Sequence, residues 1–286
     1  MNHHGKAIDE KDGYQVMDCV ECGFKHLMPI PTREELNELY EQTYHAEVKN
    51  KMFEYIERDL PWWHMHYKER YELLEEMLPW YRRRLLDVGS GAGYFLKMGK
   101  ERGWFAKGVE PSKMAVDYST DIGCNIVEGF FEDFNFSHYD VLHLDMVLEH
   151  SPDPARMLEH AHKSLELGGI IVVCVPNDYN TLQHALRRES YWVVVPWHIN
   201  YFDKDSLAKL MEKSGFKVIH TETTFPMELF LFMGQDYTKS EDARHKSHLM
   251  RVEMEFAMPK ETRKELYKKL FEHNIGRDLI MIGKKQ

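Results

Sequence analysis

The chain has 286 residues, 43% of them hydrophobic, which suits one large domain or a domain with an appendage and provides for a proper core. Its formal net charge is −10 and it has no long basic run, so we expect no nucleic-acid partner. The polar N-terminus has no signal-peptide core, and no apolar run approaches the roughly 18 residues of a membrane helix. We therefore expect no membrane contact. Four cysteines are too few for a disulfide scaffold, so we expect a cytoplasmic protein.

Residues 1–60 are predicted to form a small N-terminal appendage. Two short apolar segments, 14–18 and 24–28, flank a Cys-x-x-Cys-Gly turn. We expect two short strands around this turn. A helix should follow, because Thr32 and Glu35 have the spacing of a capping box.

The two cysteines of this turn, Cys19 and Cys22, make up half of a tetrahedral zinc site. No second Cys-x-x-Cys occurs, and the nearby histidines match no standard ligand spacing; they are His3, His4 and His26. We therefore favour a reduced, metal-free turn over a structural zinc site, and assign no metal.

Residues 61–286 are predicted to form the main domain. An aromatic-rich helix over about 61–78 could cover a ligand or simply pack on a sheet, and we favour packing. Apolar segments then alternate with helical patterns, which predicts a doubly wound, mostly parallel α/β sheet. The expected strands are residues 85–88, 105–109, 125–127, 141–144, 170–175 and 217–221.

The alternation ends after the sixth strand. Residues from about 226 to 274 are charged and mainly helical in pattern, and residues 279–282 form a last apolar strand. A terminal strand must pair with a neighbour, and residues 217–221 are the economical antiparallel partner. The helices between them then form an insertion, and the sheet has seven strands.

The most informative segment follows the first strand of this sheet. Asp87 is followed by glycines at alternate positions, Gly89, Gly91 and Gly93, and a helical pattern starts at Tyr94. Glycines let the backbone approach a ligand closely, and a helix N-terminus favours an anionic group. This order predicts a nucleoside-cofactor site at the carboxyl end of the strand.

The glycine spacing distinguishes between cofactors. A nicotinamide or flavin site requires Gly-x-Gly-x-x-Gly, but the sixth position counted from Gly89 is Tyr94. The segment instead resembles motif I of the class I S-adenosylmethionine (SAM) methyltransferases. Other landmarks agree in order with that family, namely Glu110, the segment 128–133, the segment 140–143, a "VLEH"-like segment at 146–150 and the turn 165–169.

The resemblance implies a Rossmann-like fold, SAM as cofactor and S-adenosylhomocysteine as product. It places Glu110, which Pro111 follows, on the ribose hydroxyls and one or both of Phe130 and Phe131 on the adenine. The other implied cofactor residues are Asp87, Gly89, Ser90, Gly91 and Gly93. Asp87 could alternatively be only a turn cap, and the two phenylalanines plain core residues.

Segments 175–177 and 198–202 are similar to a bacterial subgroup with small-molecule or glycosyl acceptors, which often begins with a Cys-x-x-Cys-Gly-Phe knuckle. For proton removal from the acceptor the candidates are His198 and His150, near the carboxyl ends of strands. Either could be purely structural. Asp145 could line the methionine pocket or face the acceptor. Met146 replaces a glutamate of related metal-assisted quinone O-methyltransferases, which argues against a catalytic metal.

Two rival functions are kept open. One is a nicotinamide-dependent Rossmann oxidoreductase, and the other is a SAM-binding protein without turnover. The apolar stretch 227–233 could wall an acceptor pocket, form a homodimer contact or belong to the core.

Overall fold

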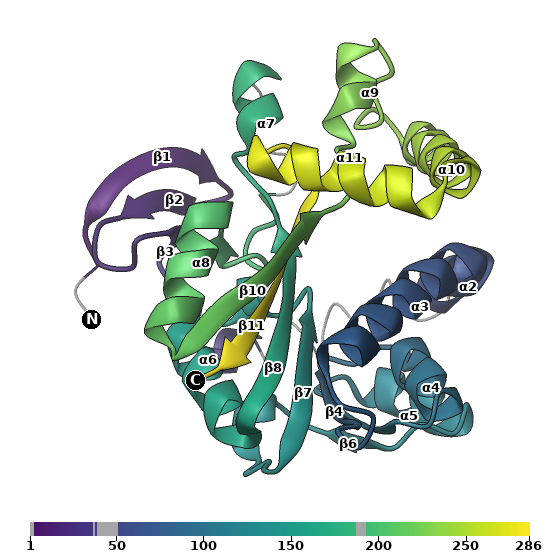
Figure 1. Ribbon diagram of the computed structural model, residues 1–286. Helices are drawn as coiled ribbons and strands as arrows, with labels where there is room; N and C mark the ends of the chain where they lie inside the picture. Colours follow the sequence, from purple (N-terminus) through teal and green to yellow (C-terminus); the bar gives the residue numbers. More distant parts are fainter. Residues whose placement is uncertain (1–2, 37, 39–50, 187–192) are drawn as a thin grey trace.

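The computed structural model describes residues 3–36, 38, 51–186 and 193–286. Its main feature is a seven-stranded sheet in the order β10-β11-β8-β7-β4-β5-β6 (Figure 1). The strands are β4 (Arg84–Val88), β5 (Phe105–Glu110), β6 (Ile126–Glu128), β7 (Tyr139–Asp145), β8 (Leu165–Pro176), β10 (Phe216–Thr223) and β11 (Asp278–Lys285). The pairs among β6, β5, β4, β7 and β8 are parallel, whereas β11 is antiparallel to both β8 and β10. The predicted α/β fold, with an antiparallel last strand, is confirmed.

Helices cover both faces of this sheet because neighbouring residues of a buried strand point to opposite sides. Leu85 and Val141 pack with α3 (Leu60–Met77) and α4 (Tyr94–Glu101). Leu86 and Leu142 pack instead with α6 (Pro154–Ser164) and α8 (Lys204–Lys213). Two further helices are α2 (Lys51–Arg58) and α5 (Lys113–Asp121). The aromatic helix α3 packs through buried Tyr71, whose ring stacks on Phe95 at 4.5 Å between centroids.

The strand β8 starts earlier than the sequence suggests. We expect a turn at the Gly168-Gly169 pair, but β8 begins at Leu165, directly after α6 ends at Ser164. The register between β7 and β8 shifts between Tyr139 and Val141, and Gly168 has φ +71. The glycines therefore lie in an irregular stretch within the strand and not before it.

The two strands expected around the cysteine turn are confirmed as β2 (Tyr14–Cys19) and β3 (Lys25–Met28). They belong to a four-stranded antiparallel sheet, which also contains β1 (Gly5–Lys11) and, from outside the N-terminal segment, β9 (Asn200–Tyr201). The Leu27 N–H donates to the Ile199 carbonyl at 2.8 Å. The appendage is thus built onto a strand that begins two residues after His198. The Thr32–Glu35 capping box is also confirmed, with N–H to side-chain distances of 2.7 and 3.2 Å.

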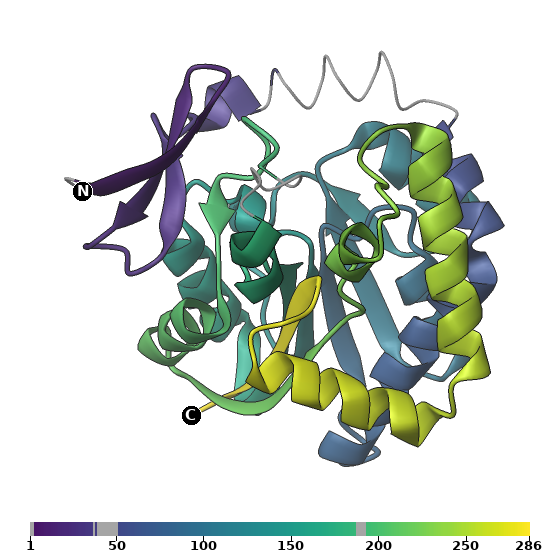
Figure 2. The same cartoon turned by 90° about the horizontal axis from the view of Figure 1, so that it is seen from above.

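Three helices of the insertion precede β11, namely α9 (Glu228–Phe232), α10 (Glu241–Ala257) and α11 (Lys260–Glu272). Two of them dock on α3: Figure 2 shows α10 running alongside α3, and Arg263 of α11 pairs with Glu69 of α3. Glu255 of α10 accepts hydrogen bonds from Trp62 of α3 and Tyr267 of α11. In the stretch 227–233, Met227 and Phe230 are buried in a separate apolar cluster with Tyr267. That stretch therefore contributes to a small core.

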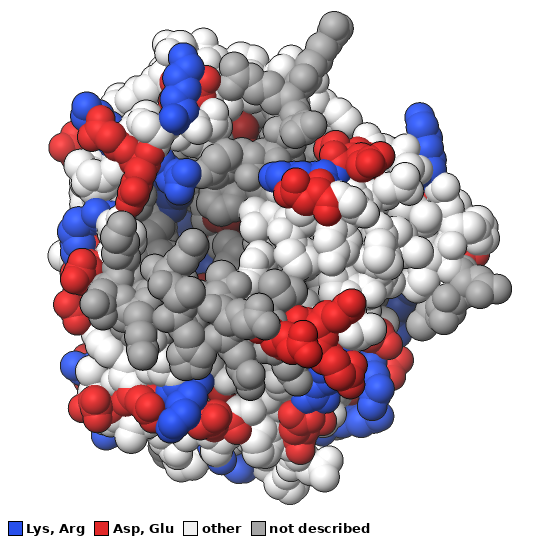
Figure 3. Space-filling model, turned by 180° about the vertical axis from the view of Figure 1, so that it is seen from behind, with Lys and Arg blue, Asp and Glu red and all other residues white. Residues whose placement is uncertain are grey.

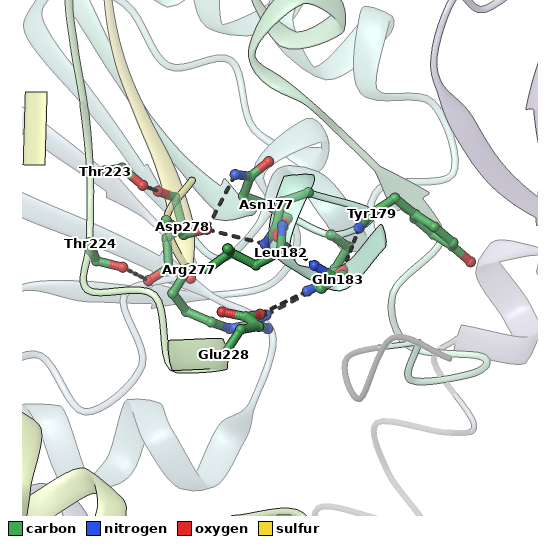
Figure 4. A network of polar contacts seen from close by, with 12 residues as sticks. Asn177, Tyr179, Leu182, Gln183, Thr223, Thr224, Glu228, Arg277 and Asp278 are labelled. Atoms are coloured by element: carbon green, nitrogen blue, oxygen red, sulfur yellow. Dashed lines mark hydrogen bonds and ion pairs between the residues drawn. The ribbon is translucent and has the colours of Figure 1, made fainter. Parts of the chain in front are cut away.

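A buried polar network joins the carboxyl end of β8 to this insertion (Figure 4). Gln183 of α7 (Thr181–Leu186) donates to Glu228 at 2.9 Å, and Arg277 lies 3.4 Å from the same carboxylate. Asn177 donates to the Gly276 carbonyl at 3.2 Å. These contacts fix the segment that leaves the sheet after β8.

The surface carries charges of both signs. On the face seen in Figure 3, acidic and basic side chains lie in mixed groups. Among the described helices, none is both long enough and apolar enough to cross a lipid bilayer.

Candidate active site

A cavity of about 900 Å³ opens at the carboxyl ends of β4, β5 and β7, where ligands bind in doubly wound sheets. Part of its wall is the glycine turn after β4, where Gly89, Gly91 and Gly93 have φ +67, +51 and +77. A Cβ atom on Gly89 would lie 2.6 Å from Val147, but a Cβ on Gly91 would meet no protein atom within 4 Å. The backbone at Gly91 therefore faces open space. Gly89 and Gly91 line the cavity, and Gly93 caps α4 behind it.

Glu110, at the end of β5, closes the turn from the next strand. Its carboxylate accepts the N–H of Gly91 at 3.0 Å and the N–H of Ser112 at 2.9 Å. Burial raises the pKa of Glu110, and the two N–H groups oppose that rise. Glu110 and Pro111 both line the cavity. A buried carboxylate fixed by backbone N–H groups is suited to accept hydroxyl hydrogen bonds.

An aromatic wall follows β6. Phe130 and Phe131 both line the cavity, but Phe131 is buried and its ring lies parallel to Phe136. The Arg33 guanidinium lies 4.8 Å from the ring centroid of Phe130 and pairs with Asp133. Phe130 is thus the more accessible ring, and Arg33, which the sequence did not indicate, reaches it from the N-terminal segment.

Asp87 lies behind the turn. Its Oδ1 lies 2.7 Å from His143 Nδ1, and both side chains are almost fully buried. Burial raises the pKa of Asp87, and the neighbouring His143 opposes that rise. The His143 ring in turn stacks on Phe95 at 4.1 Å. Asp87 therefore supports the turn from within the core. Ser90 likewise lies in the turn but not among the residues that line the cavity.

His150 and His198 lie together at the other end of the cavity. Their ring centroids are 5.0 Å apart, and both rings line the cavity with Trp197. His150 Nδ1 lies 2.7 Å from the Trp197 carbonyl. Burial lowers the pKa of His150, and this contact opposes the shift, so the ring is neutral at pH 7. A neutral imidazole can accept a proton.

Glu149 stands beside this pair and was not singled out from the sequence. It is 1% exposed, and neither carboxylate oxygen has a hydrogen-bond partner among the described residues. Burial raises its pKa well above the ordinary value. Its Oε1 lies 3.7 Å from His150 Nε2, and potential ligand atoms of Glu149, His150 and His198 lie within 4.8 Å of one another. These three side chains could hold a cation or an acceptor's polar group.

Asp145 occupies a different position from the two histidines. It ends β7, but among the described residues it is Met146 and Val147 that line the cavity at this point. Met146 has φ +55, so the chain turns sharply there. Asp145 lies near the Cys174 thiol of β8 and near Tyr67 of α3. Asp145 therefore lies at the carboxyl end of a central strand, on the side of the sheet that α3 covers.

Comparison with known proteins identifies the chain. A family model described as a methyltransferase domain matches residues 44–221, more than half of the sequence. The chain belongs to this methyltransferase family and is a SAM-dependent methyltransferase. This decides against the nicotinamide-dependent alternative.

Individual relatives agree at the level of the domain. The chain is 25% identical to an uncharacterized protein of Methanocaldococcus jannaschii over 162 residues, 56% of this chain and 76% of that protein. It is 32% identical to a ubiquinone biosynthesis O-methyltransferase of Saccharophagus degradans over 98 residues, 31% of this chain and 42% of that protein. A SAM-dependent methyltransferase from Archaeoglobus fulgidus has the same fold, with a TM-score of 0.50 and 19% identity over 77% of this chain and 94% of that one.

Proposed function

We propose that this protein methylates a small-molecule or glycosyl acceptor that carries a removable proton and binds against His198 and His150. The observation that carries the proposal is that one continuous cavity contains the glycine turn, Glu110 and both histidine rings. The donor and acceptor ends of a transfer reaction would therefore face each other without a protein wall between them.

The cofactor fits the end of the cavity at β4 and β5. We place the amino-acid end on the bare backbone of Gly89, Ser90 and Gly91, where no Cβ stands in the way at Gly91. The ribose hydroxyls then reach Glu110, next to Pro111. The adenine lies on Phe130, with Phe131 beneath it and Arg33 beside it.

The other predicted cofactor residues do not line the cavity and are proposed to support it from outside its wall. Asp87, with its partner His143, holds the turn, and Gly93 starts α4. Asp145 is proposed to face the methionine end of the cofactor from the side of α3, since it interacts electrostatically with Tyr67 of α3 and with Asp87.

The chain's own contribution to the chemistry is alignment and proton removal. SAM supplies an already activated methyl group when bound, so the protein must mainly hold the acceptor in line and exclude water. His198 would take the acceptor's proton, a role that contributes typically 10²–10⁴-fold in rate. His150, fixed by the Trp197 carbonyl, would orient the acceptor and the loop that carries His198.

The test has two arms. Calorimetric titration with S-adenosylhomocysteine should show binding, and NADH should not bind. A panel of phenols, sugars and amines is then assayed for S-adenosylhomocysteine release and for methylated product by mass spectrometry. Turnover on a hydroxyl or amine acceptor supports the proposal. Cofactor binding without turnover on any acceptor class would favour the non-catalytic alternative.

A further inference from the structure

Four side chains with metal-binding atoms meet beside the cysteine turn of the N-terminal sheet. They are His3, Cys19, Cys22 and His26, and their ligand atoms all lie within 4.8 Å of one another. Cys19 ends β2, Cys22 lies in the turn, and His26 belongs to β3 (purple in Figure 1). His3 comes from the segment just before β1. Sequence spacing hides this group because β-pairing, and not a local motif, brings His3 to the turn.

The distances match tetrahedral coordination. Zinc binds thiolate sulfur at about 2.3 Å and imidazole nitrogen at about 2.0 Å, so a sulfur and a nitrogen on one ion stand roughly 3.5 Å apart. His3 Nδ1 lies 3.3 Å from Cys22 Sγ and 3.7 Å from Cys19 Sγ. Both sulfur–nitrogen distances therefore lie within a few tenths of an ångström of the separation that one shared ion requires.

His26 is already oriented as a ligand. It is 1% exposed, and its Nδ1 lies 2.9 Å from the Leu27 carbonyl. The Nδ1–H therefore donates to that carbonyl, which leaves a lone pair on Nε2. Nε2 is buried and has no hydrogen-bond partner among the described residues. A ligating histidine typically donates its other ring N–H to a backbone carbonyl in this way. An orphaned buried nitrogen costs free energy unless something binds it.

We propose that His3, Cys19, Cys22 and His26 bind one structural zinc ion. Two sulfur and two nitrogen donors in a tetrahedral arrangement favour zinc over harder cations, and four protein ligands close the site to reaction. This inference replaces our expectation of a metal-free turn.

The proposed zinc site lies next to the strand that follows the cavity loop. His26 pairs with Asn200 of β9, two residues after His198. Phe24, in the same turn, packs on Phe202 at 5.0 Å between ring centroids. An ion that fixes β2 and β3 would therefore also fix the strand that leads out of the cavity loop.

Zinc content of the intact chain tests the proposal. The protein should carry no polyhistidine tag, since a tag would bind metal itself. Elemental analysis after extensive dialysis should give one zinc per chain. The cobalt-substituted protein should show thiolate charge-transfer bands and the d–d absorption of a tetrahedral site. Removal of the metal by a strong chelator should speed hydrogen exchange in residues 14–28 and 199–201.

Matched variants separate this site from adventitious binding. His3→Asn and Cys22→Ser should each lower zinc content at least about tenfold, since a structural site needs all four ligands. His4→Asn, at the neighbouring exposed histidine that pairs with Glu21, should keep full zinc. Retained S-adenosylhomocysteine affinity shows that each variant is folded. Zinc-free protein that stays zinc-free on reconstitution with reduced thiols, or equal zinc in His3→Asn and the parent, would overturn the proposal.

Discussion

The ring of His150 lies edge-on to the ring of His198, at 5.0 Å between centroids and 77° between planes. His150 also contacts the carbonyl of Trp197, the residue before His198, at 2.7 Å. The two histidines therefore differ in role. His150 is held by the backbone of the loop, and His198 is carried by that loop. Loss of His150 should disturb the placement of His198, whereas loss of His198 should leave the loop in place.

Replacement of His198 by alanine should lower kcat by about 10²-fold or more, because the proposed proton acceptor is lost. The Kd for S-adenosylhomocysteine should change less than about twofold, because the cofactor end of the cavity is untouched. Steady-state kinetics and calorimetry measure the two effects. His184→Ala, at an exposed histidine of α7, is the matched control and should change neither. Equal losses of kcat and cofactor affinity would instead assign His198 to structure.

The pH dependence of the same enzyme follows from His150. Burial holds its pKa below the ordinary 6.5, so the ring loses its proton before neutral pH is reached. The neutral ring positions the loop, and protonation at lower pH would place a charge in a buried site. We expect the acid limb of kcat/KM to lie below pH 6.5, and a His150→Gln variant to shift that limb. An acid limb above pH 7 would contradict this assignment.

Replacement of Gly91 by valine should abolish cofactor binding while the fold survives. The new Cβ meets no protein atom within 4 Å and so projects into the space proposed for the cofactor. The φ of +51 adds a backbone cost on the order of 1–2 kcal/mol for a residue with a side chain. Calorimetry should show at least a hundredfold loss of S-adenosylhomocysteine affinity.

Gly103→Val separates the steric effect from backbone strain. Gly103 also has positive φ, +81, and open space around its Cβ position, but it lies on the exposed turn after α4. Thermal denaturation should show comparable destabilisation of both variants. Only Gly91→Val should lose the ligand, and unchanged affinity in that variant would contradict the placement of the cofactor.

The sequence predicted most of the main sheet because its strands contain short, mostly apolar segments bounded by turn signals. It did not predict the strand residues whose conformation depends on pairing with distant segments of the chain. β1 is mostly exposed and charged, Gly5–Lys11, and β9 has only two residues. Neither carries a periodic signal. The Gly168-Gly169 pair indicates a turn locally, but Leu165 before it and Ile170 after it both pair with β7, so the pair lies in an irregular stretch within β8.

In the candidate site, a local motif predicted the glycine turn and Glu110, because their spacing is fixed by one strand–turn–helix unit and the next strand. The partners of Asp87 and His150 were not predictable in this way. His143 is 56 residues from Asp87, and the Trp197 carbonyl is 47 residues from His150. The single signal for His143 was a polar residue inside an apolar strand, which alone does not indicate a partner.

Replacement of Glu149 by glutamine should stabilise the protein as pH rises. The folded-state pKa of Glu149 is raised well above its ordinary 4.5, so folded Glu149 keeps its proton while unfolded Glu149 loses it. Above pH 4.5 the parent therefore loses up to about 1.4 kcal/mol of unfolding free energy per pH unit relative to Glu149→Gln. Urea unfolding at pH 5 and pH 7 measures the difference.

The control for Glu149 is an exposed glutamate. Glu253→Gln, at an exposed position of α10, should give the same difference from the parent at both pH values. A Glu149→Gln variant that is less stable than the parent at pH 7 would show that this carboxylate is charged in the folded protein. That result, if it depended on added divalent cation, would point to a metal at Glu149, His150 and His198.

Replacement of Glu255 by glutamine should have the opposite pH dependence. Burial opposes the charge of Glu255, but the hydrogen bond from His66, the nearby Arg251 and the hydrogen bond from Tyr267 outweigh it, and its pKa is about 2. This stabilisation is fully present above the ordinary pKa of 4.5 and is lost as pH falls towards 2. Glu255→Gln should therefore lose about 3 kcal/mol of unfolding free energy at pH 7 and much less at pH 3.

Hydrogen exchange gives a second measurement of the same effect. Because Glu255 joins α10 to α3 and α11, exchange in Glu255→Gln should rise first in the insertion, while the exposed Glu253→Gln variant behaves as the parent. An equal loss at both pH values would mean that packing, and not the buried charge, holds the insertion on the sheet domain.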